Sequence, residues 1–254
     1  MVLSALAKAV RTRQSRFVSL PPELAWHVAG YIPKPPAVAS ALGQRSATLW
    51  SAEGLRQLRG HEGGVTDLRF SPTGEWLVTT GADATAIVWD ARSGRALRTL
   101  GGQHRRSAVL FEAAVFPDGD RVATLGSDAR AVIWSVAGGR ALRRLDLRSV
   151  GDKHRIARVF PSGDRLLTGM SLSRGDPAII WRVADGAVLH RLQQPQGAIR
   201  FLELSPCGEK VLTVSFAEGM FVWNAVSGEL ERHLEFSDRR FDGTAISRSG
   251  ALVA

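Results

Sequence analysis

Tryptophan recurs through this chain at a nearly constant interval. Four apolar strings, AIVWD, AVIWS, AIIWR and MFVWN, carry Trp89, Trp134, Trp181 and Trp223, at steps of 45, 47 and 42 residues. A period of about 40 to 45 residues, in which each unit contains an apolar run with tryptophan, is typical of four-stranded blades repeated around an axis. The period therefore predicts an all-β fold made of repeated antiparallel units.

The repeat at 60–101 shows the pattern of one unit most clearly. Its turn sequences include SPTG at 71–74 and GADA at 81–84. Between the turns lie runs rich in strand formers. We expect strands at VTDLRF (65–70), WLVTT (76–80), TAIVWD (85–90) and ALRTL (96–100). The unit is thus predicted to be a four-stranded meander.

Turn residues and weaker copies extend the repeat. Each of four prolines is followed two residues later by glycine, at Pro72, Pro117, Pro161 and Pro206. Residues 36–50 align with 120–134, which places Trp50 at the position of the repeat tryptophan. Within 241–254, SRSG stands where the turn SPTG stands in the clear repeat, which indicates a further, partial copy. We expect a basic N-terminal arm at 1–19 and an incomplete β-propeller at 20–254, with blades at about 20–59 (degenerate), 60–101, 102–146, 147–192, 193–235 and, in part, 236–254.

Composition narrows the class of protein. At 254 residues and 44% hydrophobic, the chain can bury a sizeable core. No apolar run approaches the ~18 to 20 residues of a membrane span, so none is expected. The single cysteine, Cys207, excludes an internal disulfide and fits a reducing compartment, the cytoplasm or nucleus. The basic first 19 residues are also compatible with an organellar transit peptide, although a basic arm is the preferred interpretation.

One set of residues within 60–101 has the chemistry of a catalytic triad. His61, Thr79 and Asp83 supply an imidazole, a hydroxyl and a carboxylate, and Trp89 adds an indole N–H. In a meander these groups can meet at one end of the unit and satisfy one another's hydrogen bonds. Metal-ligand clusters, phosphate-binding loops and nucleophile elbows are absent from the sequence, so we expect no catalysis, metal or cofactor.

The strings GH, FSPTG and VTTGADATAIVWD are spaced as in the WD-repeat (WD40) family, which the chain resembles over residues 20–254. The resemblance implies a scaffold that binds other proteins and a structural hydrogen-bond network in each blade. The residues that match it are His61, Thr79, Asp83, Trp89, Thr124, Asp128, Trp134, Thr168, Trp181, Thr213 and Trp223.

Later repeats depart from this pattern. His104 is two residues out of register, Asp176 is displaced by one position, and Ala217 stands where the fourth repeat needs aspartate. Only the first clear blade is therefore expected to hold a complete network, and stability is expected to fall away from it.

Basic residues gather in loops expected on one rim of the propeller. They are Arg105, Arg106, Arg130, Lys153, Arg155 and Arg174. Because arginine binds carboxylate and phosphate bidentately, these residues form a candidate site for an acidic or phosphorylated peptide. The loops lack interleaved aromatic residues that could stack on bases, which makes nucleic acid the weaker candidate. Solvated arginines without a partner remain an equal alternative.

A segment near the N-terminus offers a competing identity. FVSLPPELAWHVAGYI (17–32) resembles the start of an F-box, which would imply a substrate receptor of a cullin-RING ubiquitin ligase. A complete F-box would extend past residue 50, into residues that already align with a blade. The degenerate blade is therefore the preferred interpretation, and the partner and oligomeric state are left open.

Overall fold

The computed structural model describes residues 38–41, 45–51, 54–148, 155–169, 176–194, 198–215 and 218–235. All regular elements in these ranges are β-strands, which form five antiparallel sheets, so the predicted all-β fold is confirmed. The predicted arm at 1–19 and the partial unit at 236–254 lie outside the described residues. No helix in the described ranges has the length and apolar character needed to cross a membrane.

Four sheets contain four strands and one contains three. The three-stranded sheet consists of β1 (Val38–Ala41), β2 (Ser46–Ser51) and β3 (Gly54–Arg59). The next two sheets consist of β4 (Val65–Phe70), β5 (Trp76–Gly81), β6 (Ala86–Asp90) and β7 (Ala96–Leu100), and of β8 (Leu110–Val115), β9 (Arg121–Gly126), β10 (Arg130–Ser135) and β11 (Arg140–Asp146). The last two consist of β12 (Ile156–Val159), β13 (Arg165–Gly169), β14 (Ala178–Arg182) and β15 (Val188–Leu192), and of β16 (Phe201–Leu204), β17 (Lys210–Ser215), β18 (Gly219–Asn224) and β19 (Leu230–Leu234).

The repeat tryptophans occupy one register position. Each lies opposite an aliphatic residue of the preceding strand, in the pairs Val38↔Trp50, Leu77↔Trp89, Val122↔Trp134, Leu166↔Trp181 and Val211↔Trp223. Trp50 therefore holds the same register position as the other four tryptophans, the position in which the alignment of 36–50 places it. The four strands expected within 60–101 are also present, each within one residue of its predicted bounds.

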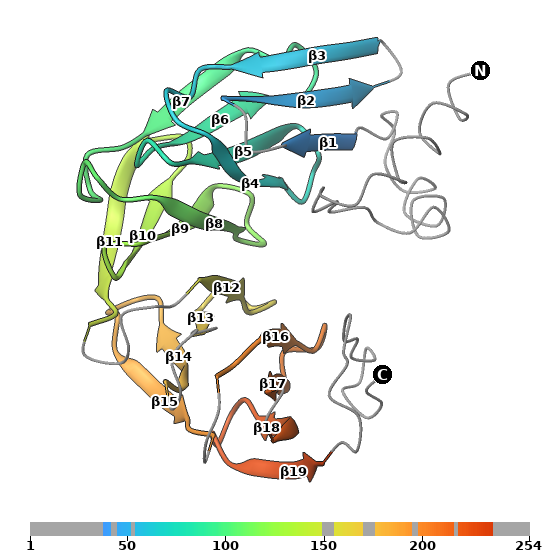
Figure 1. Cartoon of the computed structure of the whole chain (residues 1–254), viewed down its shortest axis with the longest axis vertical. Helices are drawn as coiled ribbons and strands as arrows, with labels where there is room; N and C mark the ends of the chain where they lie inside the picture. The colour runs from blue at the N-terminus through green and yellow to red at the C-terminus, as the bar shows by residue number, and fades with distance from the viewer. Residues whose placement is uncertain are drawn as a thin grey trace.

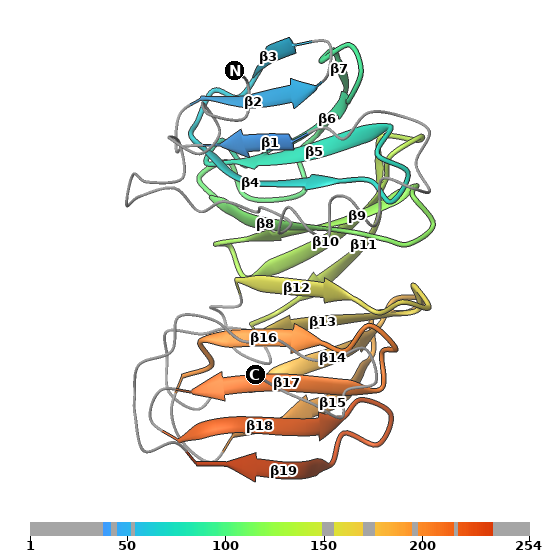
Figure 2. The ribbon, with the colours of Figure 1, turned by 90° about the vertical axis from the view of Figure 1, so that its right-hand side faces the viewer.

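The sheets follow one another around a curve, from β1–β3 at one end to β16–β19 at the other (Figure 1). Strands β4, β8, β12 and β16 form the inner side and succeed one another down the molecule (Figure 2). Neighbouring members of this series are in contact. Strands β7, β11, β15 and β19 are the outer edges of their sheets. The described sheets thus have the arrangement of successive propeller blades.

The hydrophobic core lies between adjacent sheets. Trp134 is 2% exposed and packs with Val78 and Val88 of the preceding sheet. Trp89 packs in the same way with Leu49, and Trp181 and Trp223 pack within the next two interfaces. Burying one such side chain contributes about 1.5 to 3 kcal/mol. The tryptophan period is therefore a period of contacts between sheets.

The predicted proline-glycine turns join the first and second strands of the four-stranded sheets. The turn glycines have positive φ angles, +69° at Gly74, +71° at Gly119, +69° at Gly163 and +76° at Gly208. This left-handed conformation is readily adopted by glycine and costs other residues free energy. The turn requirement explains why glycine follows each proline at the same distance.

A second set of turn glycines supports contacts between neighbouring sheets at the outer edge. Arg56, Arg98, Arg143 and His190 hold equivalent positions on β3, β7, β11 and β15. Their side chains lie against the turn glycines of the following sheet, which are Gly94, Gly139, Gly186 and Gly228, respectively. Arg143 also donates a hydrogen bond to the Asp185 carbonyl oxygen at 3.0 Å. Each outer strand is thereby supported by the next repeat.

Charged residues of alternating sign link the four inner strands. Arg69 on β4 pairs with Glu112 on β8 at 2.6 Å, and Glu112 pairs with Arg158 on β12 at 2.8 Å. Arg158 reaches Glu203 on β16 at 3.5 Å. We call these four residues the inner ladder. Burial alone would lower the pKa of Arg158, but the charges of Glu112 and Glu203 outweigh it and raise the pKa.

Carboxylates of the inner strands also bind backbone groups of the following sheet. Glu112 accepts a hydrogen bond from the Ala157 N–H at 2.7 Å, and Asp67 accepts one from the Ala113 N–H at 3.0 Å. Burial raises the pKa of Asp67 to about 6, opposed by Arg69 and reinforced by Glu112. Inner strands are thus held together by both charge and backbone hydrogen bonds.

Candidate functional site

The β4–β7 sheet contains a continuous chain of side-chain hydrogen bonds. The Trp89 indole N–H donates to Thr79 Oγ1 at 2.8 Å, and Thr79 Oγ1 lies 2.8 Å from His61 Nε2. His61 Nδ1 lies 2.9 Å from Asp83 Oδ2. Since the carboxylate accepts the Nδ1 proton, Nε2 is free to accept the threonine hydroxyl. All four predicted residues of this blade therefore meet in one network.

The Asp83 carboxylate is the hub of the adjacent turn. It accepts the backbone N–H groups of Glu62 and Thr85 at 2.8 and 3.1 Å, and the Thr85 hydroxyl at 2.7 Å. Burial by itself would raise the pKa of Asp83, but the hydrogen bonds from Thr85 and His61 outweigh it and lower the pKa to about 2. Asp83 thus fixes the loop before β4 to the turn between β5 and β6.

The β8–β11 sheet repeats this network, and the prediction that His104 is out of register was wrong. His104 Nε2 lies 2.9 Å from Thr124 Oγ1, and His104 Nδ1 lies 2.9 Å from Asp128 Oδ1. Trp134 donates to Thr124 at 2.9 Å. The two extra residues are absorbed in the connection between β7 and β8. In the part of the chain that the structure describes, two sheets hold a complete network, where one was expected.

Among the described residues, glycine marks the two sheets in which a histidine bonds to the network threonine. A Cβ on Gly81 or Gly126 would lie 2.5 Å from Nδ1 of His61 or His104, respectively. Both glycines follow the network threonine by two residues, and the third and fourth sheets have Met170 and Ser215 there. Space for the imidazole ring requires this glycine. In the sequence, Gly126 therefore indicates the role of His104 better than the distance between His104 and the start of its repeat does.

The other two four-stranded sheets keep the tryptophan–threonine bond, and in the last of them glutamine also bonds to the threonine. Trp181 donates to Thr168 at 2.8 Å, and Trp223 donates to Thr213 at 2.9 Å. Gln194 contacts Thr213 Oγ1 through its amide nitrogen, in the position that histidine takes elsewhere. It precedes its threonine by 19 residues, against 18 and 20 for the two histidines. This spacing of a polar residue is the signal that could have identified Gln194.

The order hydroxyl, imidazole, carboxylate is also the order of a nucleophilic triad. Here the Thr79 and Thr124 side chains are 0% exposed, and each already accepts an indole hydrogen bond. A nucleophile has to reach a substrate atom, and these hydroxyls contact only the protein. The arrangement satisfies buried polar groups and fixes loops.

The second network also positions part of the predicted basic rim. Asp128 accepts the Arg105 backbone N–H at 2.9 Å, and Arg130 donates to the Gln103 carbonyl oxygen at 3.1 Å. The Arg105 and Arg106 side chains are exposed. Burial would raise the pKa of Asp128, but the His104 and Arg105 hydrogen bonds outweigh it and lower the pKa. Lys153 and Arg174 lie outside the described residues.

Arg155 belongs to a different part of the same rim. Its guanidinium lies over the Phe111 ring, 4.7 Å from the centroid. Phe111, Arg155 and Arg200 each lie two residues before the partner of the network threonine, Phe111 as the second residue of β8 and the two arginines just before β12 and β16. Cation–π contact holds the guanidinium over the ring. Phe111 was not among the predicted site residues, because an aromatic residue within a strand-like pattern is normally assigned to the hydrophobic core.

Comparisons with known proteins identify a WD repeat. Residues 53–90 match the family described as WD domain, G-beta repeat. The chain is 37% identical over 86 residues to nuclear distribution protein nudF of Emericella nidulans, covering 30% of this chain and 19% of that protein. It is 34% identical over 99 residues to nuclear distribution protein PAC1 of Tuber melanosporum, covering 35% and 22%. WD repeat-containing protein 36 of Homo sapiens is 40% identical over 40 residues, covering 16% and 4%.

The matched segments are short, which limits the properties of these relatives that can be applied to this chain. The matched segments span about a fifth of the length of both nuclear distribution proteins. They support WD40-type repeats and, at a coarse level, a protein-interaction scaffold. They lend no support to the F-box-like segment at 17–32, which lies outside the described residues.

Proposed function

We propose that this chain is a non-catalytic scaffold that binds an acidic or phosphorylated segment of a partner protein on the rim formed by Arg105, Arg106, Arg130 and Arg155. Lys153 and Arg174, in neighbouring loops of the sequence, complete the proposed set. The similarity to nuclear distribution proteins favours a cytoplasmic or nuclear setting.

The observation that carries the proposal is the link between the buried network and the rim. Asp128 holds the backbone of Arg105 and lies 3.9 Å from the Arg130 guanidinium. A loop fixed in this way loses less conformational entropy on binding than a mobile one. The exposed guanidinium groups of Arg105 and Arg106 can then grip carboxylate or phosphate bidentately. The fold provides a rigid base for charges that face solvent.

Charge reversal tests the rim directly. In a fluorescence polarisation assay with a labelled acidic phosphopeptide, the variant Arg105→Glu/Arg106→Glu/Arg155→Glu is expected to bind at least about tenfold more weakly. Raising the salt concentration is expected to weaken wild-type binding, because exposed charges are screened.

A matched control separates local contacts from the effect of net charge. Arg191 and Arg232 are exposed on the outer strands β15 and β19, away from the rim. Arg191→Glu/Arg232→Glu reverses two charges, against three in the rim variant, and is expected to retain most of the affinity. Equal binding by wild type and the rim variant, both folded by circular dichroism, would refute the proposal.

A further inference from the structure

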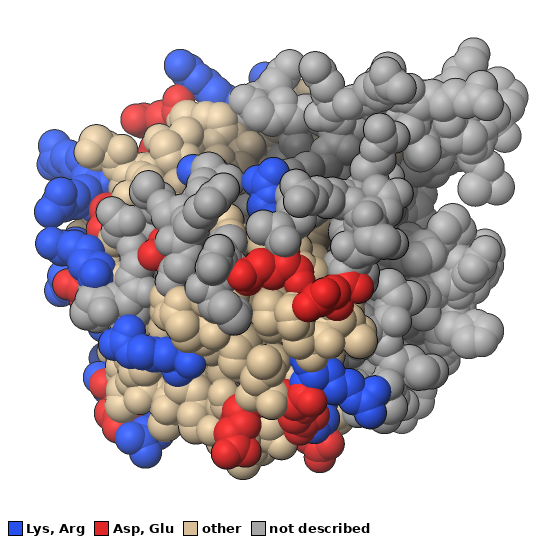
Figure 3. Space-filling model, turned by 60° about the horizontal axis from the view of Figure 1, so that its bottom comes forward, with Lys and Arg blue, Asp and Glu red and all other residues tan. Residues whose placement is uncertain are grey.

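The outer edge of the molecule contains a hollow that the rim does not use. Its volume is about 420 Å³, and it lies along β11, beside the connection that follows β7. It is lined by Gly101, Gln103, Trp134, Gly139, Ala141, Leu142 and three arginines, Arg140, Arg143 and Arg144. We call it the β11 groove. Basic side chains gather along the left-hand edge in Figure 3, the side on which β11 lies in Figure 1.

Register places one arginine of β11, Arg144, on the side of the groove that faces the preceding sheet, whereas Arg140, opposite Ser135, lies on the other face of the strand. Arg144 lies opposite Val132, and Val132 packs with Val88 across the interface. Arg144 therefore points toward the β4–β7 sheet, because directly opposite residues share one face. From that sheet Arg98 extends to Gly139, where a Cβ would lie 3.5 Å from its Cδ. Cations from both sheets thus border the gap.

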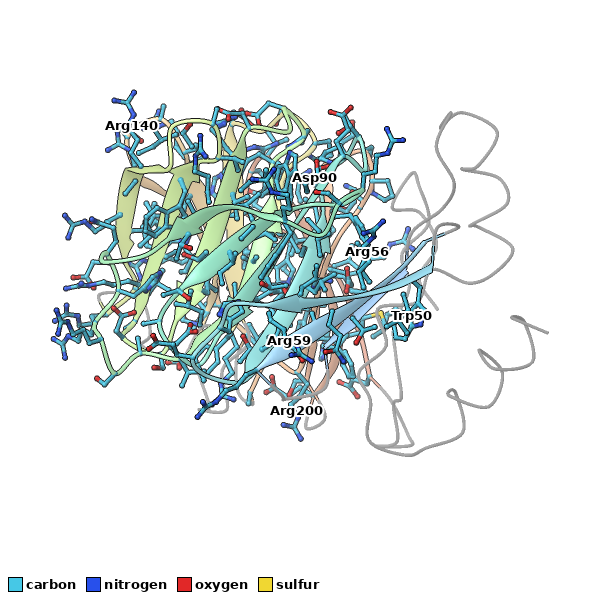
Figure 4. All side chains as sticks on the ribbon, turned by 90° about the horizontal axis from the view of Figure 1, so that it is seen from above. Trp50, Arg56, Arg59, Asp90, Arg140 and Arg200 are labelled. Carbon is cyan, nitrogen blue, oxygen red and sulfur yellow. The ribbon has the colours of Figure 1, made fainter. Side chains whose placement is uncertain are left out.

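No acidic residue is among those lining the groove. Arg143 is engaged on the opposite face, where it donates to the Asp185 carbonyl oxygen. In the ranges that the structure describes, neither Arg140 nor Arg144 pairs with a carboxylate, and both are exposed. Figure 4 shows Arg140 at the periphery, directed away from the ribbon. Uncompensated cations around a hollow favour an anionic occupant.

The shape of the groove favours an extended occupant. β11 is the edge strand of its sheet, so its outer backbone groups have no strand partner among the described elements. Arg140 and Arg144 lie near opposite ends of the strand, separated by about 13 Å at ~3.3 Å per residue. One small anion cannot bridge both side chains fully, whereas a strand-like peptide can place acidic side chains near each. Leu142, which is 44% exposed, supplies an apolar contact between them.

We propose that the β11 groove binds an extended acidic segment of a partner protein, with carboxylates on Arg140 and Arg144 and an apolar side chain on Leu142. The segment would add to the free edge of β11, where backbone hydrogen bonds give affinity and alternate side chains give specificity. This site is separate from the rim and does not depend on the function proposed for it.

The test uses the full chain and a labelled extended peptide whose two glutamates are three residues apart, as are Val132 and Ser135, the partners of Arg144 and Arg140, with leucine between them. Binding is measured by fluorescence polarisation at low salt. Arg140→Ala/Arg144→Ala is expected to weaken binding about tenfold. The control Arg191→Ala/Arg232→Ala is expected to leave it unchanged. Arg191 is the matched residue, since it lies opposite Ile179 as Arg144 lies opposite Val132.

Further arms distinguish the alternatives. The rim variant Arg105→Ala/Arg106→Ala is expected to bind this peptide normally, and its failure to do so would assign the peptide to the rim and overturn the groove. A peptide whose glutamates are two residues apart, and therefore point to the same side of a strand, is expected to bind more weakly. Equal binding of both peptides, or full competition by inorganic phosphate, would also overturn the proposal, because either would show a small-anion site.

Discussion

Glu112 on β8 accepts a hydrogen bond from the backbone N–H of Ala157 on β12, at 2.7 Å. The same carboxylate pairs with Arg69 and Arg158, so one side chain joins three consecutive inner strands. Its side chain is 8% exposed, which keeps these bonds out of bulk water.

Replacing Glu112 with alanine is expected to lower the free energy of unfolding by about 3 kcal/mol. The change leaves the Ala157 N–H without an acceptor and two cations without their shared anion, which is the costly way to break a buried pair. Urea unfolding followed by circular dichroism measures it. Glu203, at 37% exposed, is the control, and Glu203→Ala is expected to cost under about 1 kcal/mol. If the two variants lose the same free energy of unfolding, Glu112 does not link the inner strands in the way described.

Replacing His104 with alanine is expected to destabilise the protein by about 2 kcal/mol, as much as His61→Ala. Both imidazoles bridge a buried threonine and a carboxylate, and each loss leaves those groups unsatisfied. Thermal unfolding of the two variants provides the comparison. An unchanged melting temperature for His104→Ala alone would restore the expectation of a single complete network.

Asp67→Asn is expected to stabilise the protein at neutral pH and to have little effect in acid. The pKa of Asp67 is raised from 3.8 to about 6, so the folded protein binds its proton more tightly than the unfolded chain does. The contribution of Asp67 to stability is therefore largest below about pH 4 and decreases as the pH rises to about 6. Melting temperatures of both proteins across this range test the sign. A stabilisation independent of pH would contradict it.

Asp83→Asn is expected to act in the opposite sense. The pKa of Asp83 is lowered from 3.8 to about 2, so its contribution to stability is complete above about pH 4 and is lost as the pH falls toward 2. The variant should be less stable than wild type at neutral pH, and this difference should shrink in acid. Acid unfolding monitored by tryptophan fluorescence measures it, and a constant difference down to about pH 2 would be inconsistent with the lowered pKa.

Gly228→Ala is expected to cost about 1 to 3 kcal/mol more than Gly74→Ala. The two glycines have similar φ angles, +75° and +69°, so the backbone strain is shared. A Cβ on Gly228 would lie 2.5 Å from His190 Nδ1, whereas nothing lies within 4 Å of one on Gly74. Denaturant unfolding compares them. Adding His190→Ala to Gly228→Ala is expected to recover most of the extra loss in the free energy of unfolding. If nothing is recovered, the His190 ring is not the cause of that loss.

Local patterns in the sequence were sufficient to predict the four strands within 60–101, the proline-glycine turns and the register position of Trp50. The network of the first clear repeat could be predicted because its four residues lie at family spacing. Spacing alone was misleading for His104, since a loop can absorb two residues while the ring keeps its place beside Gly126. The inner ladder depends on contacts 43 to 46 residues apart between sheets, which no local pattern reveals.

The alternation of charge along the inner ladder has a consequence for how similar repeats assemble in order. Each inner strand carries the sign opposite to that of its neighbour, in the sequence Arg69, Glu112, Arg158 and Glu203. A sheet that docked beside the next but one would bring Arg69 to Arg158, or Glu112 to Glu203, and like charges would repel. The inner ladder thus favours docking of each repeat beside its neighbour in the sequence and disfavours misassembly during folding. Misassembly is a known hazard for chains built of near-identical units.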